Sequence, residues 1–299
     1  MSDVAVSPAD LGGPTDVRKV SALSLVLRSP GGLCGIAILS FFAAVAALGP
    51  WITFGDHMEV HYLADGSVAR LLTPAQHGPL GTDYYGRDIY TQLALGTRTA
   101  LLVSIVSTMF MAIVGTNIGL FAAYYGGRIE SVLMRITDLA FSVPFLPFAI
   151  ILVVLLEPSL WNIIITISCL MWRTTARVIR AQSLSVKQRT YVKAAKVAGA
   201  SDLRIIFVHI FPNVLPLSLL YVAFGISWAV LSEASLSFLG FGDPKTVSWG
   251  QMLYNAYISG SIRTAWWWTI PPGLCLTLFV ISVFLVGREL ERYINPKLW

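Results

Sequence analysis

Long hydrophobic runs separated by polar segments dominate the pattern along this chain. About six of these runs approach or exceed the ~20 residues that a helix needs to cross a bilayer. A turn signal, Glu157-Pro158-Ser159, separates the third run from the fourth. The pattern predicts an all-α, polytopic membrane protein with about six transmembrane helices. The expected spans lie near residues 31–53, 98–124, 132–156, 159–178, 213–239 and 267–287.

The composition agrees with this prediction. Of the 299 residues, 56% are hydrophobic and only 12% are charged, about half the charged share of a soluble domain. The first hydrophobic run is too long, and begins too late, for the core of a signal peptide, so we expect it to be retained as a span. We therefore divide the chain into an N-terminal segment, residues 1–30, and a transmembrane domain, residues 31–299.

The distribution of lysine and arginine orients the expected spans. With a cytoplasmic N-terminus, sixteen of the 21 basic residues fall in cytoplasmic segments and five fall outside, which is a strong positive-inside bias. Both termini are then cytoplasmic, an extracytoplasmic loop covers about residues 54–97, and a cytoplasmic loop covers about residues 182–210. The net charge of +5 follows from this topology and does not indicate a nucleic-acid partner.

Prolines and glycines interrupt several of the expected spans. Pro144 and Pro147 lie in the third, and broken helices are tolerated only where protein or a water-filled cavity satisfies the freed backbone groups. Gly115 and Gly119 form a small-xxx-small pair in the second span, which favours close contact with another helix. These features favour a gated or transporting protein over a passive anchor.

A small basic segment in the cytoplasmic loop, residues 188–202, has the pattern of a docking helix. Small or aromatic side chains recur there at spacings of three and four and form one helical face. Gly199 is expected to end this helix with a left-handed cap, and Asp202 to open the next helix. Because small side chains let another surface come close, the segment is typical of a docking site for a soluble partner. The expected face consists of Tyr191, Ala194, Ala195 and Ala198, and the opposite face of Arg189, Lys193 and Lys196.

Motifs for catalysis and nucleotide binding are absent from the sequence. There is no G-x-x-x-x-G-K-[ST] loop, no H-E-x-x-H and no G-x-S-x-G. His57 and His61 have a metal-like spacing, but a chance pair is the favoured interpretation. We therefore expect no enzyme, no cofactor and no metal on this chain.

Two acids lie inside expected spans, Asp138 and Glu233. Ionisable residues in a membrane are candidates for function by default. In a functional interpretation, each acid lines a polar pathway or couples transport to protons. In a structural interpretation, each is an interfacial or buried hydrogen-bonded residue that holds two helices together. The serines around Glu233 favour the second interpretation for that residue.

Three motifs resemble one known family, the permease subunits of bacterial ABC importers in the dipeptide, oligopeptide and nickel group, and its C-type permease in particular. Residues 233–240 resemble the family's EASLSFLG segment, and residues 191–212 resemble its EAA motif, E-A-A-x-x-x-G followed by I-L-P. The resemblance covers roughly residues 30–299. The third motif, GTDxxGRD, is matched by Gly81, Thr82, Asp83, Gly86, Arg87 and Asp88.

Two positions depart from the EAA motif. Lys193 stands where the family has glutamate, and Phe211 stands where it has leucine. The alanine face and Gly199 are kept, so we expect docking by shape to persist, while Lys193 leaves open any salt bridge that the family makes there.

The resemblance implies the fold of a type I ABC importer permease and a non-catalytic subunit that forms half of a translocation pathway. It implies a second homologous permease subunit, two ATPase subunits that bind ATP and Mg²⁺, and an extracytoplasmic solute-binding protein that delivers cargo, with peptide as the leading class. The ATPases would dock on Tyr191, Lys193, Ala194, Ala195, Ala198, Gly199 and Asp202. An ion-coupled secondary transporter and a membrane scaffold or receptor are the alternatives, but the inverted repeats and midplane charges typical of the former are not visible.

Overall fold

The computed structural model describes residues 26, 27, 29–53 and 55–294, with the side chains of all but residues 293 and 294. The expected N-terminal segment, residues 1–30, lies almost entirely outside this range. The described chain is helical, and its only β pairing consists of isolated bridges between α2 and α3, so the predicted all-α class is confirmed.

The helices follow one another along the chain with few long connections. Two of them, η2 and η3, are short π-helical turns, and η4 is a 3₁₀ turn. The elements are α2 (Pro30–Ile52), α3 (Ile89–Tyr125), α4 (Gly127–Ser142), α5 (Phe145–Leu156), α6 (Leu160–Lys187), α7 (Thr190–Val197), α8 (Asp202–Arg204), η2 (Ile205–Ile210), α9 (Phe211–Leu236), η3 (Ser237–Phe241), α10 (Trp249–Ile258), η4 (Ser261–Arg263) and α11 (Trp266–Ile294).

Four segments in the described range are long and apolar enough to cross a membrane: α2, α3, the α8–η3 segment and α11. A fifth span arises if α4 and α5 count as one, although they bend by 88° at their junction. The third expected span, residues 132–156, is thus two helices with a sharp bend between them, and the interruption expected from its prolines is present. Pro144 explains the break, because it lacks an N–H and disfavours helical geometry at Val143 before it.

The fourth expected span, residues 159–178, corresponds to α6, whose 28 residues exceed the length needed. Its second half is strongly basic, so it does not have the composition of a lipid-embedded helix. The turn before it is where the sequence predicts it. Ser159 caps α6 by accepting a hydrogen bond from the Asn162 amide (3.2 Å), and Glu157 ends α5 with a positive φ of 68°.

Two loop boundaries differ from expectation. Helix α3 begins at Ile89, so the loop before it is shorter than the expected 54–97. The expected loop 182–210 is mostly helical, because α6 continues to Lys187 and α7, α8 and η2 follow almost at once.

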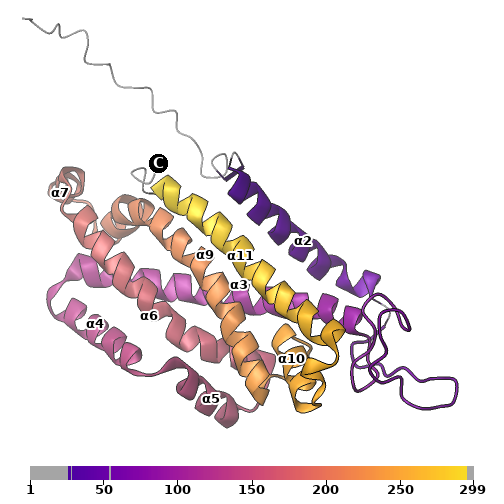
Figure 1. The fold of residues 1–299 in the computed structure, drawn as a ribbon. Helices are drawn as coiled ribbons and strands as arrows, with labels where there is room; N and C mark the ends of the chain where they lie inside the picture. Colours follow the sequence, from indigo (N-terminus) through magenta and orange to yellow (C-terminus); the bar gives the residue numbers. More distant parts are fainter. Residues whose placement is uncertain (1–25, 28, 54, 295–299) are drawn as a thin grey trace, which may run out of the picture.

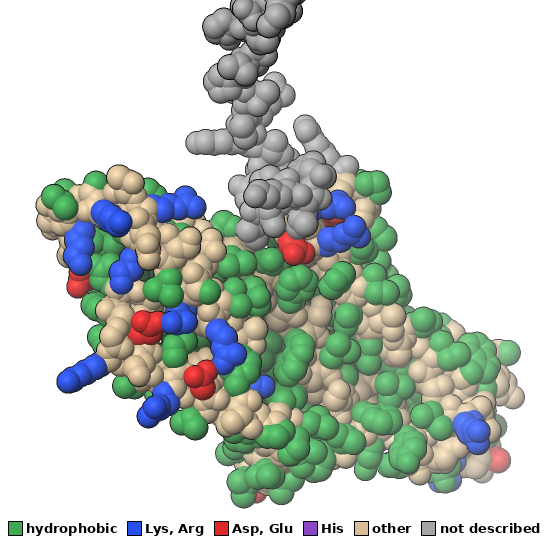
Figure 2. Space-filling view, turned by 60° about the vertical axis from the view of Figure 1, so that its left-hand side comes forward, with side chains coloured by type: hydrophobic (Ala, Val, Ile, Leu, Met, Phe, Trp, Pro, Cys, Tyr) green, Lys and Arg blue, Asp and Glu red, His purple; other side chains and the backbone are tan. Residues whose placement is uncertain are grey.

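The bundle has two distinct ends (Figure 1). Helix α7 lies at the same end as the start of α2 and the end of α11, and we call this the α7 end. The α2–α3 loop and α10 lie at the opposite end. Charged side chains gather on the part of the surface formed by α4, α6 and α7, whereas the face beside it is largely hydrophobic (Figure 2).

A close contact joins α3 to α6 through the two glycines that the sequence singles out. A Cβ on Gly115 would lie 2.7 Å from the Trp172 carbonyl oxygen, and a Cβ on Gly119 would lie 2.7 Å from the Ala176 carbonyl oxygen. Real Cβ atoms do not come so close to backbone, so only glycine permits this approach. The predicted close contact at this pair is confirmed.

Enlarging Gly119 is therefore expected to separate α3 from α6. We predict that Gly119→Leu lowers the free energy of unfolding by about 1–3 kcal/mol or prevents assembly of the fold, as overpacking does elsewhere. The matched control is Gly273→Leu in α11, where a Cβ would meet nothing within 4 Å. Thermal unfolding in detergent checks both variants, and equal stability of the two would contradict the packing argument.

Candidate functional site

Helix α7 projects from the end of the bundle and is exposed almost all round. Val192 is its one buried residue, with 4% of its surface exposed. Of the expected docking face, Tyr191, Ala194 and Ala198 are exposed and Ala195 is half-buried. The helix therefore touches the bundle through a narrow strip and leaves the rest of its surface free.

Val192 joins α7 to a hydrophobic cluster that we call the α7 cluster. It includes residues of α3, α6, η2 and α9, so the anchor of α7 is shared by four other elements. Its buried members are Leu120, Tyr124, Ile179, Val186, Val192, Ile205, Ile206, Ile210 and Val214.

Gly199 ends α7 in the way that the sequence predicts. Its φ is +83°, a left-handed conformation that costs other residues about 1–2 kcal/mol. The Gly199 amide donates to the Lys196 carbonyl (3.1 Å) and the Ala200 amide donates to the Ala195 carbonyl (3.1 Å), which is a Schellman motif. A Cβ here would meet nothing within 4 Å, so backbone conformation, not crowding, requires the glycine.

Asp202 has a different role from the one expected. Ser201 is the N-cap of α8, and Asp202 is the first residue inside that helix. The Asp202 carboxylate accepts a hydrogen bond from the hydroxyl of Tyr124 at the end of α3, at 2.5 Å. Nearby, the Lys187 ammonium donates to the carbonyls of Ala123 (3.1 Å) and Tyr124 (2.6 Å). These bonds tie both sides of α7 to the end of α3.

The signature run at residues 81–88 folds the α2–α3 loop around one carboxylate. Asp83 is fully buried and accepts hydrogen bonds from the amides of Tyr85 (2.8 Å) and Arg87 (2.9 Å). Its second oxygen accepts from Arg87 Nε (2.7 Å) and Gln92 Nε2 (3.1 Å). Because Gln92 lies in α3, the same carboxylate connects the loop to the helix.

The other residues of this run also have structural roles. Asp88 caps α3 by accepting from the Thr91 amide (2.7 Å), and the Thr82 hydroxyl donates to the Ala69 carbonyl (2.5 Å). Gly81 and Gly86 have φ values of +72° and +79°, and a Cβ on Gly81 would lie 2.1 Å from the Leu72 carbonyl oxygen. The signature therefore builds the loop and starts α3.

The two intramembrane acids lie apart and differ in environment. Glu233 is 3% exposed and accepts a hydrogen bond from the Ser237 hydroxyl (2.6 Å), four residues further along the same continuous helical segment. Asp138, on α4, is 65% exposed in its side chain and pairs with Arg177 of α6 at 2.7 Å. Because Asp138 joins α4 to α6 and is also exposed, it fits both the structural interpretation and the interpretation as a residue of a polar pathway.

No metal site is evident in the described residues, where no three histidine, cysteine or acidic side chains cluster. His57 pairs with Asp56 (2.8 Å), whereas the His61 ring packs on His77, with 4.7 Å between centroids. On the same loop, hydrogen bonds from the hydroxyl and the amide of Ser67 hold the pKa of the exposed Asp65 below its usual range.

Residues 115–299 match the family model described as binding-protein-dependent transport system inner membrane component. The chain belongs to this family. It is a permease subunit, and members of this family act as non-catalytic, multi-pass membrane components. The family itself binds no cofactor, and the ion-coupled alternative gains no support.

Relatives and a solved structure agree with this assignment. The chain is 35% identical over 278 residues to the dipeptide transport system permease protein DppC of Haemophilus influenzae, covering 91% of this chain and 92% of the relative. It is 33% identical over 280 residues to the di/tripeptide transport system permease protein DppC of Pseudomonas aeruginosa, covering 91% and 89%. An inward-facing structure of the MetNI methionine ABC transporter has the same fold, with a TM-score of 0.54 at 20% identity, over 69% of this chain and 95% of that chain.

Some residues at the α7 end escape the sequence analysis. In the sequence Val192 and Val197 are ordinary apolar positions. In the structure Val192 anchors α7, whereas Val197 is 90% exposed. Tyr124 is 78 positions from its partner Asp202, and only a pairing pattern across homologues could have indicated it.

Removing the Tyr124 hydroxyl should loosen the segment around α7. We predict that Tyr124→Phe costs about 1.5–3 kcal/mol, the range for a hydrogen bond to a charged group, and that trypsin then cuts faster at Lys193 and Lys196. Tyr125→Phe is the matched control, because the neighbouring ring stacks on Phe121. Equal cleavage of both variants would show that the Tyr124–Asp202 bond does not restrain α7.

Neutralising Asp83 should unfold the α2–α3 loop. In Asp83→Asn the Arg87 guanidinium loses its charged partner in a buried setting, which costs about 3–5 kcal/mol. Asp65→Asn, on the exposed part of the same loop, should change stability by less than about 0.5 kcal/mol. Thermal unfolding midpoints in detergent measure the difference, and a small effect at Asp83 would contradict its central role.

Proposed function

We propose that this chain is one of two homologous permease subunits of an ATP-driven peptide importer, and that α7 receives force from the ATPase subunits. The observation that supports this most directly is the shape of α7. It is an exposed helix with alanines on its proposed docking face, held to the bundle by one buried side chain and by bonds on both sides. The names of the relatives reported above support peptides as the substrate class.

The proposed orientation places the α7 end in the cytoplasm together with both termini. The excess of lysine and arginine at that end supports it. The α2–α3 loop and α10 then face outward, where a solute-binding protein would dock. ATP and Mg²⁺ would bind only to the two ATPase subunits below α7.

The proposed docking surface of α7 combines shape with one apolar contact. Tyr191, Ala194 and Ala198 offer a low surface that a groove can cover closely, and Val197 at the end of the helix adds an exposed apolar side chain. Lys193 and Lys196 are exposed beside it, so acidic residues in the partner groove would complement this surface. An acidic partner groove would also match Lys193, which stands where the family has glutamate.

Force applied at α7 has a direct route into the bundle. Val192 transmits it to the α7 cluster, and the Tyr124–Asp202 and Lys187–α3 bonds keep α7 from tilting relative to α3. In the proposed mechanism, closure of the ATPases therefore moves α3, α6 and α9 together and switches the pathway between its two faces.

The experiment uses the assembled complex in liposomes, with the binding protein and peptide outside and ATP inside. Val197→Asp should weaken co-purification of the ATPase subunits by about 2 kcal/mol or more, as loss of a central interface contact does, and uptake should fall in parallel. Leu63→Asp is the control for co-purification of the ATPases, because Leu63 is also apolar and exposed but lies on the α2–α3 loop, far along the chain from α7. Uptake by this chain without ATPases, or normal assembly of Val197→Asp, would contradict the proposal.

A further inference from the structure

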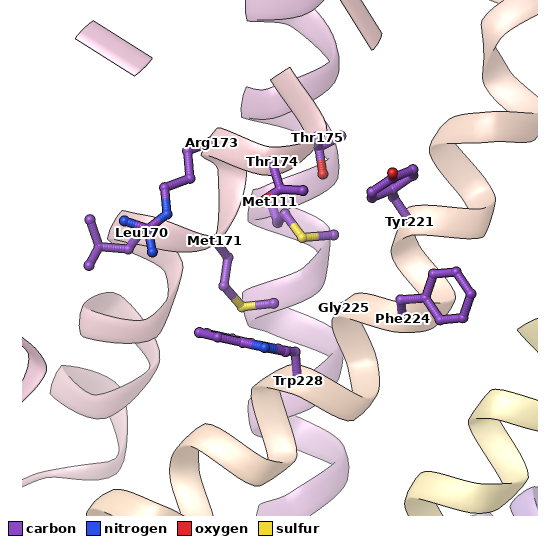
Figure 3. Close-up of a pocket in the computed structure, with 10 residues that line it drawn as sticks. All are labelled: Met111, Leu170, Met171, Arg173, Thr174, Thr175, Tyr221, Phe224, Gly225 and Trp228. Carbon is purple, nitrogen blue, oxygen red and sulfur yellow. The ribbon is translucent and has the colours of Figure 1, made fainter. Parts of the chain in front are cut away.

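A cavity of about 210 Å³ opens between α3, α6 and α9, and no part of the function proposed above uses it. Figure 3 shows Met111, Met171 and Trp228 pointing toward one another across it, with Tyr221 and Phe224 along α9. An apolar cavity of about 150 Å³ holds a benzene ring, so this one is large enough for one aromatic or branched side chain.

Polar groups are few in the cavity wall. The Thr175 hydroxyl is buried without a hydrogen-bond partner among the described residues. Arg173 lines the cavity and is the one charged residue that does so. A cavity with apolar walls and a few placed polar groups is the usual form of a small-molecule site.

Arg173 lies beside the break between α4 and α5. Its Nη1 donates to the carbonyl oxygens of Ala140 and Val143, at the end of α4, so it satisfies groups that the broken helix leaves free. Its Nε and Nη2 make no hydrogen bond to any described residue, and its Cζ lies 5.0 Å from the centroid of the Phe141 ring of α4. Phe145, at the start of α5, packs on Trp228 with 4.7 Å between ring centroids, so the break borders the cavity.

This side of the molecule is unsuited to lipid. One turn along α6 from Arg173, the Arg177–Asp138 pair is exposed, by 51% and 65% of the two side chains. Charged groups in a membrane face protein or a water-filled space, because their exposure to hydrocarbon is costly. The same reasoning places the mouth of the cavity toward water or toward a partner, not toward acyl chains.

We infer that this cavity is a subsite of the translocation pathway that accepts the apolar C-terminal side chain of a peptide, with the terminal carboxylate bound by Arg173. This inference rests on the proposed function and names the part of the substrate that this chain contacts. A guanidinium with two free donors suits a carboxylate, and flexible methionine side chains adapt to apolar groups of different shape. The subsite therefore favours an apolar last residue without requiring one particular side chain.

The first test narrows the cavity and measures uptake of two dipeptides by the complete complex. Thr174→Trp, at an exposed position in the cavity wall, should lower uptake of Ala-Phe by about tenfold relative to Ala-Ala, in line with discrimination by pocket size. Thr277→Trp is the control, on an exposed part of α11, and should leave the ratio unchanged. The affinity of the isolated binding protein for each dipeptide is measured separately. The substitutions lie in the permease and leave this affinity unchanged, so a change in the uptake ratio comes from the permease.

The outcomes separate this inference from the proposed function. If the unsubstituted complex takes up neither dipeptide with ATP, the proposed function fails. If it takes up both and Thr174→Trp leaves their ratio unchanged, or reduces both equally, only the subsite is overturned.

A second measurement identifies what occupies the cavity. In a complex whose Cys34, Cys169 and Cys275 are replaced by alanine, Thr174→Cys should react with a water-soluble maleimide. Ala-Phe should slow the reaction, and Ala-Phe amide, which lacks the carboxylate, should not. No reaction in any nucleotide state would mean that the partner subunit or lipid fills the cavity, and equal protection by both peptides would exclude Arg173 as the carboxylate site.

Discussion

The close approach of α3 and α6 at Gly115 and Gly119 is the contact on which the other features of this protein depend. In a membrane, helices gain little from the hydrophobic effect by packing together, so close van der Waals contact must supply the attraction. Two glycines four residues apart let the backbones of α3 and α6 meet. This contact brings Met111 and Met171 to the same cavity and places the end of α6 where Lys187 reaches the last carbonyls of α3.

The second constraint is that backbone and charged groups need partners wherever water is scarce. Arg173 donates hydrogen bonds to carbonyl oxygens at the break between α4 and α5. Asp83 accepts hydrogen bonds from four N–H groups at the end of the bundle opposite α7. The two signature segments also satisfy structural needs at helix ends. Residues 81–88 start α3 and fold the loop before it. Residues 233–240 include Ala234, where α10 approaches α9 so closely that a Cβ on Gly250 would lie 2.4 Å from the Ala234 carbonyl oxygen. Their sequence patterns follow from structure at the ends of helices.

Local patterns in the sequence were enough to predict the local features. Hydropathy located the long apolar helices, the Glu157-Pro158-Ser159 turn fell between α5 and α6, and Gly199 has the left-handed cap that its position indicates. Long-range features could not be predicted in this way. Whether Pro144 bends a helix slightly or by 88° depends on packing against α6 and α9, and the Tyr124–Asp202 bond joins positions far apart in the chain. The α7 face was assigned from periodicity alone, which identified its small residues but not Val192 as the anchor.

These contacts together describe α7 as a rigid extension of α3, α6 and α9 and not as a flexible tether. The distance between spin labels at Thr190, an exposed residue at the start of α7, and Ile105, on an exposed part of α3, tests this most directly in the assembled transporter. Our account predicts that this distance stays the same with and without ATP while, in the complex proposed above, the Thr190 label moves relative to a label on the partner permease. A change in the Thr190–Ile105 distance, with α3 and α6 unmoved, would contradict it.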